Sequence, residues 1–285
     1  MQQHPAIACD NNRKTLFIST ISKRQQMASE HSTHNPIPWD HALSITPSVT
    51  ERRGARFGQA ENMTEPLSVL ALYSTSGYYV DIRVAKADDQ NTLDLTKSNF
   101  DTPLSNDLEW AFAGKVEIRL LDQQDTKPIS RAHARARWTR IIDSQLKYLP
   151  DEADEADLTV QPDRSILEAG VFPNPTTGEE EPFEEIWQLV PPLPSIDNCI
   201  VLKTDHQDPQ IRGLVVRVGQ WCQGILYLSK DDKVVERWHL EVTGNLVRDV
   251  RFGESTVSLP CTNSFTHLEV GGSIELDGIN WVVVE

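Results

Sequence analysis

Residues 213–226 read GLVVRVGQWCQGIL, and residues 234–238 continue with VVERW. Both stretches combine strand-type alternation of apolar residues with polar side chains and tryptophan. Successive side chains of a β-strand point to opposite faces of the sheet, so such alternation is typical of strands that bury one face. The two stretches therefore predict an all-β fold in this half of the chain.

Further strands are expected around this stretch, at spacings of roughly ten residues, which is typical of a sandwich or a barrel. Asp277-Gly278 predicts a hairpin turn, and residues 280–285 are expected to form a last strand that closes the sheet. A closed barrel removes exposed strand edges. The other strands are expected near Cys199–Leu202, Gly213–Val218, Gly224–Leu228, Val234–Val242, Val247–Phe252, Thr256–Leu259, His267–Val270 and Ser273–Leu276.

The length of the chain, 285 residues, exceeds the usual size of one domain, so two domains are expected. The sequence PPLP at residues 191–194 marks the boundary, because successive prolines remove backbone donors and stiffen the chain. The predicted fold is two antiparallel β-barrels, lipocalin-like in general character. The predicted organisation is a disordered tail over residues 1–44, a first barrel over 45–190, a Pro-rich linker over 191–196 and a second barrel over 197–285.

Two strands of the first barrel are expected to form a hairpin, at residues 67–73 (LSVLALY) and 78–84 (YYVDIRV). The second of these alternates strictly, so its side chains fall into two sets on opposite faces. We expect the apolar set to face the barrel interior and the charged set to face outward. The inward set is Val80, Ile82 and Val84, and the outward set is Asp81 and Arg83.

The remainder of the first barrel is expected to come from shorter strand-like segments. Trp110 and Phe112 share one face of a strand, and Gly114 marks the end of that strand or a bulge in it. Residues 130–137, which are rich in Ala and Arg, fit either a short helix or a basic strand. Further strands are expected at residues 115–120, 137–143, 164–170 and 182–190.

The formal charge of −15 argues against a general nucleic-acid binder and against an anionic membrane surface, because both need clustered Lys and Arg. Twelve Asp or Glu residues lie between Asp151 and Glu185, against the single basic residue Arg164. We interpret this acidic connection as a solvated loop, and the alternative is a docking face for a basic partner.

The cysteine usage fits a reducing compartment, and the hydropathy predicts no membrane helix. The four cysteines are too scattered for a disulfide framework or a zinc ribbon, and no apolar run approaches the roughly 18 residues of a membrane helix. A mitochondrial presequence is the weaker reading of the N-terminal stretch, because Asp10 and Glu30 interrupt it. We expect a cytoplasmic and nuclear protein without membrane insertion.

Several short segments, taken in order, resemble a fungal family of casein-kinase-interacting proteins with two β-barrels, the Hri-one family. The resemblance covers about residues 45–285, and it implies two antiparallel barrels, no assigned catalytic residues and a casein kinase I-type kinase as partner. The tail and the acidic connection depart from the family pattern. The segments are Thr64–Pro66, Tyr79–Arg83, Glu109–Gly114, Trp138 with Ile142–Ser144, Pro182–Trp187, Arg217–Leu226, Val235–Trp238, Leu259–Cys261 and Trp281–Glu285.

Common catalytic and cofactor motifs are absent from the sequence, so no catalytic, cofactor or metal residue is predicted. Cys222 would need a base such as His239 beside it to act as a nucleophile, and a buried structural cysteine is the favoured interpretation. His31 and His34 lack further ligands for a metal. The candidate pocket or motif positions are Arg83, Trp110, Gln220, Trp221, Gln223, Arg237 and Trp238.

Three functions remain open at this point. The leading hypothesis is a non-enzymatic protein-interaction module. The first alternative is a carrier or sensor of a small apolar ligand, because barrels of about eight strands can hold one small molecule. The other alternative is a barrel-type isomerase or cyclase, which predicts an open pocket lined by a buried carboxylate or histidine.

Overall fold

The computed structural model groups Trp39–Glu285 into one compact unit. Most of the predicted N-terminal tail and part of the predicted linker lie outside the described residues. No helix among the described residues has the length and apolar character needed to cross a membrane. The structure describes Leu43 and residues 47–86, 104–121, 133–146, 149, 151–174, 177–191, 193, 199–262 and 268–285.

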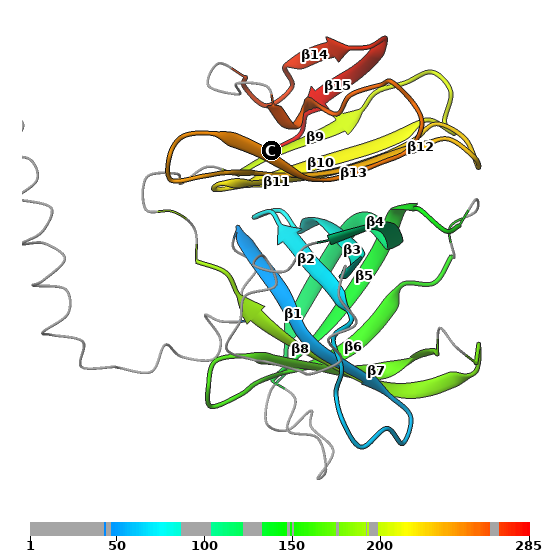
Figure 1. The fold of residues 1–285 in the computed structure, drawn as a ribbon, viewed down its shortest axis with the longest axis vertical. Coiled ribbons are helices and arrows are strands. Elements are labelled where there is room, and N and C mark those ends of the chain that lie inside the picture. The colour runs from blue at the N-terminus through cyan, green and yellow to red at the C-terminus, as the bar shows by residue number, and fades with distance from the viewer. Residues whose placement is uncertain are drawn as a thin grey trace, which may run out of the picture. The chain divides into compact units, whose positions relative to one another are not determined.

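The first half of the chain forms a closed antiparallel barrel of eight strands, in which β8 pairs back onto β1 (Figure 1). This confirms the predicted all-β class and the predicted first barrel. The strands are β1 (Ser48–Phe57), β2 (Leu67–Tyr73), β3 (Tyr78–Lys86), β4 (Leu104–Leu120), β5 (Ala134–Asp143), β6 (Asp154–Val160), β7 (Ile166–Pro173) and β8 (Glu180–Leu189).

Strand β4 merges two segments that were expected to be separate strands, and Gly114 lies at the junction as a bulge. The register between β4 and β5 shifts between Ala113 and Gly114. A Cβ atom at Gly114 would lie 1.9 Å from the backbone oxygen of Thr139, so the close approach of the two strands requires glycine here. Of the ambiguous segment at 130–137, the part from Ala134 onward belongs to strand β5.

The acidic connection is not a solvated loop, because much of it forms the barrel wall as β6, β7 and β8. Its acidic side chains are paired across strands with arginines. Arg135 of β5 contacts Glu155 at 2.9 Å and Asp157 at 3.0 Å, and Arg56 of β1 contacts Glu184 at 2.6 Å. Cross-strand pairing of opposite charges lets an acidic segment form strands, which a count of charge along the chain does not reveal.

The two faces of β3 are the reverse of the prediction. Its apolar side chains face out of the barrel and belong to a core shared with the second half of the chain, whereas its charged side chains line the barrel interior. The physical reason is that the outer face of β2 and β3 is covered by the second sheet and so must be apolar. The outward set is Val80, Ile82 and Val84, and the inward set is Asp81 and Arg83.

The second half forms a seven-stranded antiparallel sheet in the order β13-β12-β11-β10-β9-β15-β14, with β13 and β14 as its edges. The predicted second barrel is therefore not confirmed, because the sheet formed by the described residues is not closed. The strands are β9 (Cys199–Thr204), β10 (Arg212–Val218), β11 (Trp221–Tyr227), β12 (Lys233–Leu240), β13 (Leu246–Phe252), β14 (Ser273–Leu276) and β15 (Ile279–Val283), and η2 (Pro260–Thr262) is a 3-10 helix.

Two local predictions for the second sheet have different outcomes. The hairpin turn is confirmed, because Asp277 and Gly278 join β14 to β15 with φ values of 50° and 80°, as a tight turn of the I′ kind requires. The strand expected at residues 256–259 does not form, and the described part of 267–270 is not a strand either. Both segments instead lie in irregular backbone.

Both faces of the central strands β10 and β11 are buried, so these strands hide their apolar side chains although the sheet does not close. One face shares a core with the outer surface of the barrel, through residues such as Leu214 and Ile225 packed with Leu70 and Ile82. The opposite face packs in a separate cluster. That cluster includes Leu202, Val215, Cys222, Leu226, Leu259, Cys261 and Trp281.

A buried polar network crosses the contact between barrel and sheet. Arg237 is only 1% exposed. Its guanidinium donates to Gln223 Oε1 at 2.7 Å, to Ser68 Oγ at 3.1 Å and to the backbone oxygen of Ile82 at 2.7 Å. The Gln223 amide nitrogen in turn donates to two backbone oxygens of the barrel at 3.0 Å each. The network therefore fixes the sheet on the barrel.

The Glu285 side chain makes a second polar link to the barrel, at the turn between β2 and β3. Its carboxylate accepts hydrogen bonds from Ser74 Oγ at 2.7 Å, from the backbone nitrogens of Thr75 at 2.8 Å and Ser76 at 3.0 Å, and from Ser76 Oγ. Partial burial raises the pKa of Glu285, but the hydrogen bonds from Ser76 and Ser74 outweigh it and lower the pKa to about 2.

Candidate functional site

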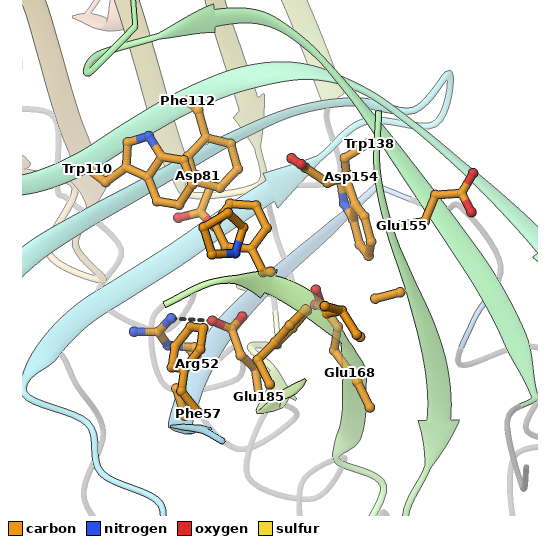
Figure 2. Close-up of a pocket in the computed structure, with 18 of the residues that line it drawn as sticks. Arg52, Phe57, Asp81, Trp110, Phe112, Trp138, Asp154, Glu155, Glu168 and Glu185 are labelled. Carbon is orange, nitrogen blue, oxygen red and sulfur yellow. Dashed lines mark hydrogen bonds and ion pairs between the residues drawn. The ribbon is translucent and has the colours of Figure 1, made fainter. Parts of the chain in front are cut away.

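The barrel encloses a cavity of about 1350 Å³ that is open to solvent and is lined by residues from all eight strands (Figure 2). One part of the interior is filled by a mainly apolar cluster that includes Val116, Ala134, Ala136 and Leu158, and the remaining space forms the cavity. The aromatic lining residues are Phe57, Tyr73, Tyr79, Trp110, Phe112, Trp138, Phe172, Phe183 and Trp187.

A first cluster of ion pairs lies on the cavity wall at β1, β3 and β8. Arg52 contacts Glu65 at 2.7 Å and Glu185 at 2.5 Å, and the latter contact is drawn in Figure 2. Arg83 contacts Asp81 at 3.1 Å and shares Glu185 at 3.4 Å. Burial alone would raise the pKa of Glu185, but Arg52 and Arg83 lower the pKa below its ordinary value.

Arg140 forms a second ion-paired group and packs against aromatic rings of the wall. Its guanidinium contacts Asp143 at 2.7 Å and Asp154 at 2.5 Å. It lies 4.8 Å from the ring centre of Trp110 and 5.8 Å from that of Phe172. Since Trp110 Nε1 also donates to Asp143 at 3.0 Å, the ring and the ion pair hold one another in place.

Glu168 on β7 differs from the other carboxylates of the cavity. It lies directly opposite Glu185 in the β7–β8 register, and no described residue forms an ion pair or hydrogen bond with it. Burial and then the negative charge of Glu185 raise the pKa of Glu168 to about 8. At neutral pH the empty cavity therefore holds Glu168 mainly as the neutral acid.

A family model described as Protein HRI1 matches residues 48–285, which span the barrel and the second sheet. The chain belongs to the HRI1 family. Protein HRI1 of Kluyveromyces lactis is 27% identical over 199 residues, or 62% of this chain and 78% of that relative. Protein HRI1 of Saccharomyces cerevisiae (strain Zymaflore VL3) is 24% identical over 261 residues, or 84% of this chain and 98% of the relative.

The HRI1 fold also has a structural counterpart. The crystal structure of an uncharacterized protein, YLR301w, from Saccharomyces cerevisiae superposes with a TM-score of 0.63 at 21% sequence identity, covering 84% of this chain and 98% of that one. This likeness supports the fold. The family suggested by the ordered segments of the sequence is thus confirmed, and the comparisons assign it no biochemical activity.

Only two of the seven candidate positions line the cavity of this HRI1 family member, namely Arg83 and Trp110. Gln223 and Arg237 belong to the network between barrel and sheet. Gln220 accepts a hydrogen bond from the backbone nitrogen of Leu193 at 2.9 Å. Trp221 and Trp238 lie in the second sheet, on β11 and β12.

Cys222 does not pair with a histidine base. The register of β11 and β12 places Trp238 opposite Cys222 and His239 opposite Trp221, so His239 falls on the other face of its strand. His239 instead contacts Asp249 at 2.9 Å. Cys222 is 2% exposed and packs in the cluster that holds Cys261, which agrees with a structural cysteine.

Among the described residues no group of three or more His, Cys, Asp or Glu side chains is arranged to hold a metal ion. His31 and His34 lie outside the described residues.

Glu168 is the residue of the candidate site that sequence reasoning missed. The available signal was its place on the same strand face as Ile166 and Phe172, where an acidic residue interrupts an apolar pattern.

Proposed function

We propose that the barrel of this HRI1 family member is a binding site for one small, largely apolar molecule, which the protein carries or senses. The observation that carries the proposal is the cavity of about 1350 Å³ with its aromatic wall. Ligand pockets in proteins commonly have volumes of about 300–1,000 Å³, with apolar and aromatic walls and few polar groups. The barrel therefore has room for a whole small molecule.

The polar groups of the wall support the same conclusion, because they are organised without a ligand. Arg52, Arg83 and Arg140 are held by carboxylates, and Arg140 also packs on Trp110 and Phe172. Preorganised walls lower the entropy cost of binding. An eight-stranded barrel can fill its interior with side chains, whereas this barrel leaves part of its interior open.

Native and denaturing mass spectrometry of gently purified protein test the proposal. We expect a small-molecule adduct that is lost on denaturation, together with weaker retention of that adduct by Phe172→Ala, which removes an aromatic ring of the wall. Val242→Ala is the matched control, because Val242 is 88% exposed in the second half. A bare chain that also binds no aromatic fluorescent probe would contradict the proposal.

A second candidate is a barrel-type isomerase or cyclase, and Glu168 is the observation that favours it. A carboxyl group with a pKa near 8 is suited to proton transfer at neutral pH. The test is incubation of the recovered ligand with the wild-type protein and with Glu168→Gln. Conversion by the wild-type protein alone supports an enzyme, and a ligand returned unchanged from both contradicts it.

The protein-interaction role and the casein kinase I-type partner stay proposals that rest on the resemblance of the sequence segments. Co-purification of the tagged chain with a recombinant casein kinase I-type kinase tests the partnership, and lack of a complex at micromolar concentrations contradicts it. The cytoplasmic and nuclear localisation also stays a proposal. A fluorescent fusion expressed at native level tests it.

A further inference from the structure

The charges of the cavity indicate what kind of ligand fits it. We propose that the molecule bound in the barrel carries a basic, positively charged nitrogen that pairs with Glu168. This inference rests on the proposed ligand-binding function and narrows its ligand to organic cations with an apolar body. It depends on two features of the cavity: the pairing of its arginines and the position of Glu168 beside an aromatic ring.

Every described arginine that lines the cavity already has a carboxylate partner. An anionic ligand would therefore have to displace a carboxylate before it could pair with a guanidinium. A cationic ligand needs no such displacement, because no described residue forms an ion pair with the carboxyl group of Glu168. The pairs are Arg52 with Glu65 and Glu185, Arg56 with Glu184, Arg83 with Asp81 and Glu185, Arg135 with Glu155 and Asp157, Arg137 with Glu155, and Arg140 with Asp143 and Asp154.

Glu168 also lies beside a second carboxylate, which favours a cation at this position. Directly opposed residues of an antiparallel pair have Cβ atoms about 4.5–5.5 Å apart, so Glu168 faces the negative charge of Glu185 at close range. A ligand cation beside Glu168 would relieve this repulsion and stabilise the ionised carboxylate. The charged and titratable groups that act on Glu168 from the surrounding strands are Arg52 of β1, Tyr73 of β2, Asp81 and Arg83 of β3 and Glu185 of β8.

Aromatic rings near Glu168 provide contacts for the carbon substituents of such a cation. Gly170 follows Glu168 on the same strand face, and a Cβ atom there would lie 2.8 Å from Phe183 Cε1. The Phe183 ring therefore covers the strand next to Glu168. Carboxylates combined with aromatic faces are the usual means by which proteins bind organic ammonium groups.

Three probes with one aromatic body and different charges test the proposal. They are dansylcadaverine, which ends in an ammonium group, N-pentyl dansylamide, which is neutral, and 6-(dansylamino)hexanoic acid, which is anionic. Binding is measured by dansyl fluorescence at pH 8.5, where most Glu168 is ionised. We expect the ammonium probe to bind at least about tenfold more tightly than the neutral one, as one charge-assisted hydrogen bond implies.

The pH dependence and a matched pair of variants identify Glu168 as the cause. Between pH 8 and pH 6 the affinity for dansylcadaverine should fall by about fiftyfold in total, because Glu168 must lose its proton to pair with the cation. Glu168→Gln should remove both the preference and the pH dependence. Glu275→Gln is the control, since Glu275 is exposed on β14 of the second sheet and does not line the cavity.

The probe measurements distinguish failure of the cation inference from failure of the ligand-binding proposal. If all three probes bind and the neutral or anionic probe binds as tightly as the ammonium probe, the cation inference is wrong and the ligand-binding proposal stands. If no probe binds, both are contradicted. The probe comparison uses the wild-type protein, so it decides the question even if Glu168→Gln fails to fold.

Discussion

Replacement of Arg237 by methionine tests whether a buried polar network holds the second sheet on the barrel. The guanidinium donates three hydrogen bonds, to Gln223, Ser68 and the backbone of Ile82. Two of these acceptors belong to the barrel, and no described carboxylate forms an ion pair with Arg237. Methionine has a similar length but donates no hydrogen bond, so Arg237→Met leaves the three acceptors without their donor.

The size of the effect follows from two opposing contributions. Burial lowers the pKa of Arg237 to about 10, and a shift of this size corresponds to roughly 3 kcal/mol of cost for the buried charge. Hydrogen bonds that involve a charged group contribute about 1.5–3 kcal/mol each, so the three bonds outweigh that cost. We expect Arg237→Met to lower the free energy of unfolding by about 2–5 kcal/mol.

Urea denaturation followed by tryptophan fluorescence measures the change, and the m-value shows whether the sheet still unfolds together with the barrel. Arg248→Met is the control, because Arg248 is exposed and its main described contact is with the Trp238 ring at 5.3 Å; its effect should stay below about 1 kcal/mol. A loss below about 0.5 kcal/mol for Arg237→Met would show that the network contributes nothing net and that the apolar core alone holds the sheet.

Three further predictions concern stability. The folded-state pKa of Glu285 is about 2, so the stabilisation by its carboxylate is present above pH 4.5 and is lost as pH falls toward 2. In thermal denaturation, Glu285→Gln should therefore be less stable than wild type at pH 7 and nearly equal to it at pH 2. Gly114→Ala should lower stability by at least about 2 kcal/mol, since its Cβ atom meets Thr139; an unchanged melting temperature would contradict the tight bulge. Because the pKa of Glu168 is raised, its ionisation destabilises the empty protein increasingly from pH 4.5 to 8. In urea titrations, Glu168→Gln should be more stable than wild type by about 1–3 kcal/mol at pH 9 and equal to it at pH 4.

The strands were predictable where the local pattern alone determines them. Residues 67–73 form β2 with the expected bounds, because an apolar run bounded by turn residues has few other stable conformations. The turn at Asp277 and Gly278 was predictable for a similar reason, since only residues that tolerate positive φ can form it. In both segments the determinants lie within a few residues of one another.

Features that depend on distant contacts were not predictable. Alternation on β3 shows that Asp81 and Arg83 share a face, but both faces of β3 are buried, so the pattern does not show which face lines the barrel. The acidic residues of β6 to β8 form strands because arginines such as Arg135 and Arg140 lie across from them. These partners become neighbours only after the barrel closes.

The candidate site was predictable only in part for the same reason. Arg83 and Trp110 stood out as polar or aromatic residues in otherwise apolar strands, and both line the cavity. Glu168 lies within a segment rich in acidic residues, so its interruption of the apolar face of Ile166 and Phe172 is only a weak local signal. Its distinguishing property, an unpaired carboxyl group opposite Glu185, arises from the pairing of β7 with β8.

The inverted faces of β3 explain how a small barrel can keep an open, charged interior. A barrel normally gains much of its stability by filling its interior with apolar side chains. Here a large apolar core lies outside the barrel, where Leu70, Ile82 and their neighbours pack against the second sheet. Because that core provides much of the burial of apolar surface, the interior can hold arginines, carboxylates and empty space. The second sheet therefore stabilises the cavity although none of its residues lines it.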